Sequence, residues 1–168
     1  ASDNPFLVML DEDTGGKYAR ATETTGSGDS GEMNWLIKDM VEEMKSWEHT
    51  GGTNGHVIMK SDNENAVKSL RDAVGRLLCS RVIPESPPKG ESQANGRIEE
   101  AGKTIRGFVK IIISQIEDRA GIIIKGDDII TQWIIRWTAM LPSRILAGKD
   151  KKIAYQRRRG RKCDIPIE

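Results

Sequence analysis

The chain is predicted to be an α/β layered domain, because short apolar runs typical of strands alternate with segments of helical periodicity. Strand-like runs occur at residues 6–10, 17–23, 56–60 and 81–84, and helical patterns lie between and after them. Such alternation is the pattern of layered folds in which helices cover a sheet. The length of 168 residues suffices for one compact domain.

The N-terminal part is expected to form a strand, a turn, a returning strand and a helix. The apolar run at residues 6–10 ends at Asp11 and is typical of a buried strand. Asp13-Thr14-Gly15-Gly16 is a turn signal. Residues 32–47 carry apolar side chains at helical spacing. A further strand at Thr22–Thr25 remains an alternative to a loop.

The middle of the chain is expected to form a strand, a helix and a short strand. Residues 56–60 predict a second buried strand, which Asp62 follows directly. Apolar residues from Val67 to Leu77 mark an amphipathic helix. The short strand at 81–84 is followed by Pro87-Pro88-Lys89-Gly90, which excludes a helix or a central strand and indicates a loop.

Two helices are expected in the C-terminal half. The first should begin between Ser92 and Ala94 and run to about Arg119, with Gly121 ending it. Residues 122–125 fit either a strand or a loop. Asp127 or Asp128 should cap a last helix that reaches Leu141, with Pro142 after it.

Composition excludes several classes of protein. The net charge of +1, with 37% hydrophobic and 30% charged residues, is ordinary for a soluble globular protein. No apolar stretch is long enough to span a bilayer, and the start of the chain does not resemble a secretory signal. Two cysteines and two histidines at unfamiliar spacings argue against disulfide or zinc frameworks and fit a reducing compartment. The missing initiator Met suggests a fragment of a longer chain.

Basic residues gather near the C-terminus. Residues 149–162 contain eight Lys or Arg and one acid, Asp150. We therefore divide the chain into a core at 1–148 and a basic extension at 149–168. The extension can be read as a solvated tail, as a segment that contacts nucleic-acid phosphates, or as a nuclear import signal.

Three carboxylates are candidates for chemistry. Asp11 and Asp62 each end a predicted strand, where ligands bind in open α/β sheets, although an Asp there can also serve as a turn former or helix cap. Glu99 lies near the start of the long helix. Basic residues follow it at helical spacing, namely Lys103, Arg106 and Lys110. The alternative for this ridge is an ordinary solvated helix face.

Three hard carboxylates around one point suit Mg²⁺ or Mn²⁺. Two such ions held roughly 4 Å apart can activate an attacking oxygen and stabilise a leaving one, which is the chemistry of phosphodiester cleavage and transfer. An adjacent basic ridge would hold the nucleic-acid backbone.

Four motifs resemble those of retroelement (retrotransposon and retroviral-type) integrase catalytic cores of the DDE superfamily. A strand ends at an Asp before a short turn at residues 8–15, and Ser61-Asp62 follows a strand. Asn95-Gly96-Arg97-Ile98-Glu99 follows a polar loop, and residues 154–162 contain a Tyr and end in Gly-Arg-Lys. Fifty residues separate the first two acids and 36 the last two, which is close to the family spacing. The motifs span almost the whole chain.

The resemblance implies a ribonuclease-H-like fold, with a mixed central sheet flanked by helices. It implies that Asp11, Asp62 and Glu99 bind two Mg²⁺ or Mn²⁺ ions. DNA contacts are expected at seven positions: Asn95, Lys103, Arg106, Lys110, Arg157, Arg158 and Arg159. The sequence departs from the pattern by placing acids beside the predicted ligands, namely Asp13, Glu64 and Glu100.

We accordingly expect an integrase core that processes the 3′ ends of element DNA and joins them to target DNA inside the nucleus. The alternatives are a ribonuclease-H-like nuclease or transposase, and a domesticated, catalytically silent domain that binds DNA or a partner. Family cores pair, so a homodimer or higher homo-oligomer is expected, through the apolar helix at 129–137 or the helix at 32–47. No membrane partner is expected. The four tryptophans are expected in the core: Trp35, Trp47, Trp133 and Trp137.

Overall fold

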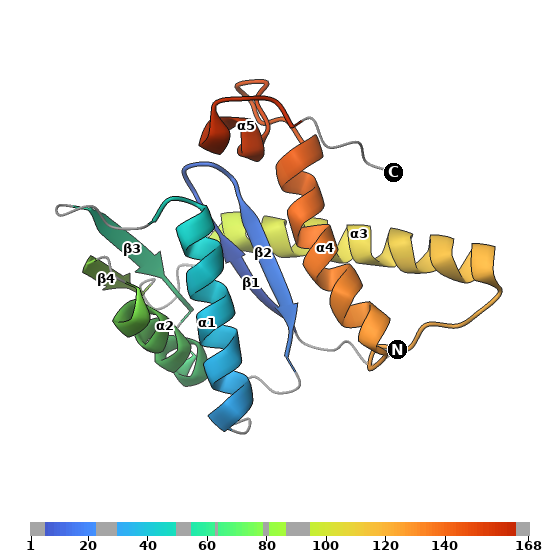
Figure 1. The fold of residues 1–168 in the computed structure, drawn as a ribbon, viewed down its shortest axis with the longest axis horizontal. Helices are drawn as coiled ribbons and strands as arrows, with labels where there is room; N and C mark the ends of the chain where they lie inside the picture. Colours follow the sequence, from blue (N-terminus) through green and yellow to red (C-terminus); the bar gives the residue numbers. More distant parts are fainter. Residues whose placement is uncertain are drawn as a thin grey trace. The chain divides into compact units, whose positions relative to one another are not determined.

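The computed structural model describes residues 6–22, 30–49, 55–62, 64–78, 81–86 and 95–163 (Figure 1). The chain forms two compact units, one made of residues 1–22 with 97–168 and one made of residues 23–96. The elements follow in the order β1 (Phe6–Leu10), β2 (Lys17–Ala21), α1 (Ser30–Ser46), β3 (His56–Lys60), α2 (Asn65–Leu77), β4 (Arg81–Glu85), α3 (Gly96–Ala120), α4 (Ile129–Ile145) and α5 (Ala154–Arg159). The sequence predicts this order from β1 to α4, whereas it does not predict helix α5, which lies in the basic C-terminal extension.

The first unit is built on a β-hairpin. Strands β1 and β2 pair in antiparallel fashion, from Phe6 opposite Ala21 to Leu10 opposite Lys17. The turn between them contains Gly15, whose φ of +81° is a conformation that favours glycine. The predicted turn at residues 13–16 is therefore confirmed.

One face of this hairpin carries the core of the first unit. Because side chains alternate along a strand, residues two apart on each strand share a face. Helices α3 and α4 contribute to this core, and α4 packs along β2 (Figure 1). The buried members are Ala19, Ile105, Ile135 and Ala139, with Phe6, Val8, Ala21 and Val109 packed against them. Full burial of an isoleucine stabilises a fold by about 1.5–3 kcal/mol, so Ile105 and Ile135 hold both helices to the hairpin.

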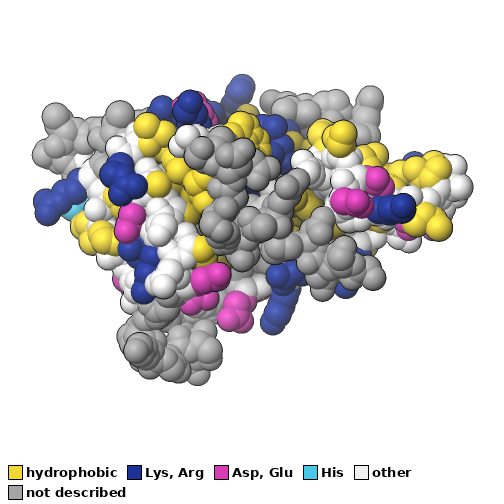
Figure 2. Space-filling model, turned by 90° about the horizontal axis from the view of Figure 1, so that it is seen from below, with side chains coloured by type: hydrophobic (Ala, Val, Ile, Leu, Met, Phe, Trp, Pro, Cys, Tyr) yellow, Lys and Arg dark blue, Asp and Glu magenta, His cyan; other side chains and the backbone are white. Residues whose placement is uncertain are grey.

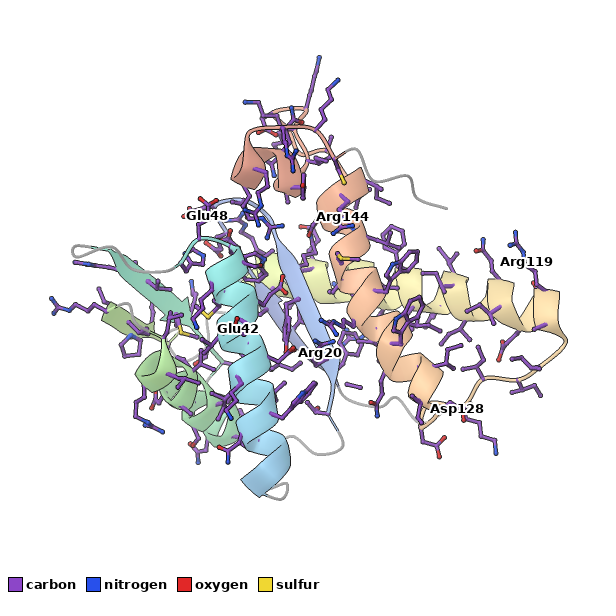
Figure 3. All side chains as sticks on the ribbon, in the orientation of Figure 1. Arg20, Glu42, Glu48, Arg119, Asp128 and Arg144 are labelled. Carbon is purple, nitrogen blue, oxygen red and sulfur yellow. The ribbon has the colours of Figure 1, made fainter. Side chains whose placement is uncertain are left out.

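The connection between α3 and α4 is a loop rather than a strand. Helix α3 ends at Gly121, which has a φ of +65° and donates its amide to the Glu117 carbonyl at 2.8 Å. The Glu117 carboxylate then accepts the Ile124 amide at 2.8 Å. Asp128, labelled in Figure 3, is the N-cap residue of α4 and one of the two predicted caps, but its carboxylate accepts the Lys125 amide at 2.6 Å rather than an amide of the helix.

Helix α4 continues past the point at which the sequence predicts its end. Pro142 was expected after the helix but lies inside it, and the helix reaches Ile145. Proline in a helix removes one backbone hydrogen bond. Pro142 is fully buried beside two other buried residues of the last turns, Thr138 and Ser143. Burial in the core therefore outweighs the local preference for a helix end.

The second unit contains α1, β3, α2 and β4. Strands β3 and β4 pair in parallel from His56 opposite Arg81 to Lys60 opposite Glu85, and α2 covers one side of them, where Gly75 faces Val82. Helices α1 and α2 also pack together (Figure 1). The predicted strand at residues 56–60 is confirmed, but its predicted burial is wrong, because alternate side chains are exposed and Ile58 is 63% exposed. A sheet covered on one face leaves every second residue outside.

The fold is a mixed α/β fold, as predicted. A single central sheet is not present among the described residues, which instead form two sheets of two strands each, one per unit. Residues 23–25, where a further strand was considered, lie outside the described residues. No helix in the described part of the chain combines the length and the apolar character needed to cross a membrane.

Candidate catalytic carboxylates

Asp11 is held in a defined position by its own turn. Its amide donates to the Gly16 carbonyl at 2.9 Å, and its carbonyl accepts the Gly15 amide at 2.8 Å. The Thr14 hydroxyl donates a short hydrogen bond to Oδ2 of Asp11, and the Gly16 amide donates to that hydroxyl at 3.2 Å. The Asp11 side chain is only 6% exposed. The backbone of Asp11 is thus held by Gly15 and Gly16, and its carboxylate is oriented by Thr14.

The first turn of α3 lies next to this hairpin turn. Arg97 forms an ion pair with the Glu12 carboxylate at 3.2 Å and donates to the Glu12 carbonyl at 2.9 Å. Burial lowers the pKa of Lys17; the negative charge of Glu100 acts against this shift, and the positive charge of Arg157 adds to it. Lys17 Nζ also donates to the Gly15 carbonyl at 3.3 Å. The helix that carries Glu99 therefore begins at the strand end that carries Asp11.

Glu99 and the basic ridge are exposed to solvent. Ala101 and Ile105 form the buried stripe of α3, and Glu99 lies on the opposite side of the helix. The other residues on that side are Lys103, Arg106 and Lys110, all exposed. The Arg106 guanidinium lies 5.1 Å from the ring centre of Phe6, so the ridge borders the start of β1. This placement suits either a ligand-binding face or a solvated one.

Asp62 and Asn95 belong to the second unit. Asp62 follows β3 and is exposed. The residue before it is braced: Ser61 donates its amide to the Glu85 carbonyl at 3.1 Å, and its hydroxyl accepts Nη1 of Arg71 at 3.1 Å. Arg71 also reaches Ser86 at 3.3 Å and pairs with Asp72 at 2.8 Å. Asn95 is half-buried just before α3.

The predicted ligands are divided between the units. Asp11 and Glu99 lie in the first unit and Asp62 in the second, so their convergence stays a prediction. Among the residues that the structure describes, no three His, Cys, Asp or Glu side chains form a group that could hold a metal ion. The polar loop before Asn95, at residues 87–94, lies outside them. The donor chemistry is nevertheless that of magnesium, since all three side chains offer hard oxygen atoms.

The basic C-terminal segment is folded around one of its arginines. It contains α5, which packs against α4, and Arg144 of α4 lies over the ring of Tyr155 at 6.0 Å (Figure 3). Arg157 pairs with Asp150 at 2.5 Å and donates to the Thr14 carbonyl at 2.7 Å. Arg159 is exposed, whereas Arg158 is half-buried. DNA contact stays a prediction for all three arginines of α5.

Two of the four tryptophans are not in the core. Trp47 is buried, as predicted, whereas Trp35 is 55% and Trp133 56% exposed, so the prediction is wrong for these two. Trp133 stacks on Trp137 with ring centres 5.8 Å apart. Residues four apart share one side of a helix, and α4 buries a different stripe that includes Ile134 and Thr138. Apolar side chains also reach the surface at the far end of α3 and the following loop (right-hand side of Figure 2), where Ile111, Ile122 and Ile123 are exposed.

Sequence reasoning missed the residues that support the carboxylates. Thr14 was read only as part of a turn, although a hydroxyl three residues after an Asp is placed to bond its side chain. Arg71 and Lys17 gave no signal, because their partners lie on other elements. Arg157 was read as part of a charge run, and its pairing with Asp150, seven residues earlier, could have been considered.

The chain resembles a solved structure without matching a known family. No protein-family model matches it, and no curated protein does. Its fold resembles a chain in the cryoEM structure of the simian T-cell lymphotropic virus intasome in complex with PP2A regulatory subunit B56 gamma, with a TM-score of 0.60 and 12% identity. The likeness covers 97% of this chain and 50% of that one, so this chain spans half of its length. At this identity the likeness concerns the fold, which this chain shares with a chain of a retroviral intasome assembly.

Proposed function

We propose that the chain is the catalytic core of a retroelement integrase with a ribonuclease-H-like fold. The observation that carries the proposal is the juxtaposition of Asp11, fixed in the β1–β2 turn, with the first turn of α3, which bears Glu99. A carboxylate at a strand end and a second one on an adjacent helix are the start of a metal site for phosphodiester chemistry. The likeness in fold to a chain of an intasome supports the same reading.

Asp11, Asp62 and Glu99 would hold two Mg²⁺ or Mn²⁺ ions. When bound, such ions activate an attacking water or DNA 3′-hydroxyl and stabilise the leaving oxygen of the phosphodiester. The protein supplies the geometry: the Thr14 hydroxyl fixes one oxygen of Asp11, which orients the carboxylate before any ligand arrives. Buried and hydrogen-bonded, this carboxylate cannot turn away as an exposed one can.

DNA is the proposed substrate, both as element ends and as target. Lys103, Arg106 and Lys110 form a positive ridge on the same side of α3 as Glu99, where they would bind the backbone phosphates. Asn95 and the exposed Arg159 would add contacts. Joining two ends requires more than one active site, so we propose a homodimer or higher homo-oligomer that works in the nucleus. The exposed Trp133, which stacks on the half-buried Trp137, offers an apolar surface for that assembly.

Two other functions remain candidates. A hydrolytic nuclease or transposase would use the same carboxylates but would release cleaved DNA without joining it. A domesticated, silent domain would bind DNA or a partner with no metal-dependent step. Both are outcomes of the experiment below.

The test is an assay of 3′-processing, strand transfer and disintegration on matched element-end DNA, with Mg²⁺, with Mn²⁺ and with chelator. Asp11→Asn, Asp62→Asn and Glu99→Gln should each lower activity by at least about a hundredfold, as loss of one preorganised electrostatic group does. The matched controls are the acids beside them: Asp13→Asn, Glu64→Gln and Glu100→Gln should retain activity within about threefold. Circular dichroism confirms folding of each variant.

The outcomes separate the candidates. Cleavage without joining would indicate a nuclease, and metal-independent DNA binding without cleavage would indicate a silent domain. Full activity of Asp62→Asn, or equal loss in Glu99→Gln and Glu100→Gln, would contradict the assigned triad.

A further inference from the structure

Arg157 occupies a cradle that is shaped for its guanidinium group. Four of its N–H groups are directed at oxygen atoms. Nε and Nη2 donate to the two carboxylate oxygens of Asp150 at 2.9 and 2.5 Å, Nη2 also donates to the Lys152 carbonyl at 2.8 Å, and Nη1 donates to the Thr14 carbonyl at 2.7 Å. An arginine has five such donors in a rigid fork, so nearly all of them are used within the protein.

The cradle depends on two glycines. A Cβ atom added to Gly148 would lie 2.1 Å from Nη2 of Arg157, so no other residue fits there without displacing the guanidinium. A Cβ atom added to Gly15 would lie 3.4 Å from Nη1, and the φ of +81° at Gly15 is unfavourable for other residues. Between Gly148 and Lys152 the chain turns back on itself, with the Gly148 amide donating to the Lys152 carbonyl at 2.9 Å. The segment thus covers most of the Arg157 side chain, which is 24% exposed.

Thr14 links this cradle to Asp11. Its carbonyl accepts Arg157, while its hydroxyl donates to Asp11 and accepts the Gly16 amide. Movement of the Thr14 backbone would therefore move the hydroxyl that orients the carboxylate. Figure 1 shows the β1–β2 turn lying beside α5, although 143 residues separate Thr14 from Arg157.

We propose that Arg157 is a positioning residue, which locks the β1–β2 turn through Thr14 so that Asp11 is preorganised to bind a divalent cation. This role rests on the proposed function, and it differs from the DNA contact that the sequence suggests for Arg157. Asp150 neutralises the guanidinium, so little charge and few donors remain for a phosphate. The hydrogen bonds that Arg157 donates to the Asp150 carboxylate raise the pKa of Arg157 and hold the pKa of Asp150 well below its usual range.

The test uses Mn²⁺ binding by calorimetry, DNA binding in chelator, and hydrogen exchange of the turn amides. Gly148→Ala keeps every charge but fills the cradle, and Arg157→Ala empties it. Both variants should weaken Mn²⁺ binding roughly tenfold, as loss of groups that orient metal ligands does. Exchange of the Gly15 and Gly16 amides should quicken in both, while DNA affinity in chelator stays within about twofold of wild type. Arg157→Lys should restore part of the Mn²⁺ affinity.

Arg159→Ala is the matched control, because it removes the same charge from the exposed side of α5. It should weaken DNA binding without changing Mn²⁺ affinity or amide exchange. If Arg157→Ala instead behaves like Arg159→Ala, Arg157 is a DNA contact and the positioning role is wrong. If amide exchange quickens but Mn²⁺ affinity does not change, Arg157 only stabilises the turn, which also overturns the proposal. If the wild-type chain binds no Mn²⁺, the proposed function itself is contradicted. Hydrogen exchange of the turn amides would still show whether Arg157 locks the turn.

Discussion

The two strand ends that carry predicted metal ligands differ in how firmly each Asp is held. In the first unit, Asp11 is 6% exposed, and its carboxylate accepts a bond from Thr14 in the same turn. In the second unit, Asp62 is exposed, and Arg71 donates a hydrogen bond to the hydroxyl of its neighbour Ser61. Both ends use an arginine from a helix: Arg157 reaches the Asp11 carboxylate through Thr14, whereas Arg71 binds the residue before Asp62.

The difference in exposure separates a buried, preorganised ligand from one at the surface. A carboxylate already oriented loses little entropy when it binds a cation, whereas an exposed side chain must be ordered at that moment. Asp11 is therefore expected to dominate the affinity for the first ion. Asp62 would complete the site when DNA and metal are both present.

The largest expected effect compares the cores of the two units. Ile105 is fully buried between the hairpin and α4, so Ile105→Ala should cost about 2–5 kcal/mol of unfolding free energy. Ile58 of β3 is 63% exposed, so Ile58→Ala should change the unfolding free energy by less than about 0.5 kcal/mol. Urea unfolding followed by tryptophan fluorescence measures both.

The same pair of variants can contradict this difference in packing between the two units. If Ile58→Ala is as destabilising as Ile105→Ala, the outer face of β3 is covered in solution and the second unit is more tightly packed than its exposure indicates. If the slope of the unfolding free energy against urea concentration changes in Ile105→Ala while the midpoint stays the same, the substitution has instead altered the unfolded state.

An intermediate effect is expected from the hydroxyls at the two strand ends. Thr14→Val removes the donor to the buried Asp11 with little change of shape, and should weaken Mn²⁺ binding roughly tenfold. Ser61→Ala removes the hydroxyl that accepts a bond from Arg71, next to the exposed Asp62. It should weaken Mn²⁺ binding by about twofold, as expected of a hydrogen bond worth roughly 0.5 kcal/mol. Calorimetric titration with Mn²⁺ measures both.

Thr14→Ser is the control, because it keeps the hydroxyl and should retain near wild-type affinity. Equal losses in Thr14→Val and Ser61→Ala would show that the two carboxylates are equally preorganised, contrary to the difference in their surroundings.

Local sequence patterns predicted where the strands and helices lie better than they predicted how each one is buried. The order of strands and helices from β1 to α4, the turn at Gly15 and the end of α3 near Gly121 follow from period, turn residues and glycine positions, which are properties of short segments, whereas α5 was not predicted. Pro142 and the exposed face of β3 were predicted wrongly because burial depends on what packs against a segment. Periodicity alone does not reveal that partner.

The candidate site shows the same division. Motif spacing singled out Asp11, Asp62 and Glu99, but the contacts around Asp11 come from positions that no short pattern connects. Arg157 illustrates the cause: a run of basic residues indicates charge, whereas its function depends on an Asp and two carbonyls that the fold brings to it. Charge patterns therefore suggest a partner, and only the structure shows which charges are already satisfied.

The smallest expected effect concerns the ridge beside Glu99. Lys103→Ala and Arg106→Ala should each lower the log–log salt slope of DNA binding by about one, the value for one lost phosphate contact. They should differ in stability, because Arg106 lies over the Phe6 ring and such a contact is worth about 0.5–1 kcal/mol at an exposed site. Fluorescence anisotropy across a salt series measures the slope, and thermal unfolding measures the stability.

Arg119→Ala is the matched control for this ridge, since Arg119 lies on the same helix near its other end (Figure 3). Sixteen residues of helix separate it from Lys103, or about 24 Å at 1.5 Å per residue. A phosphate bound near Glu99 is beyond its reach, so its removal should leave the slope unchanged. If all three variants lower the slope equally, α3 binds DNA along its whole length and the ridge does not mark the active site. If no variant lowers the slope, the exposed lysine and arginine of the ridge are solvated side chains that do not bind DNA. Helix α3 then differs from the rest of the first unit only in how its residues pack.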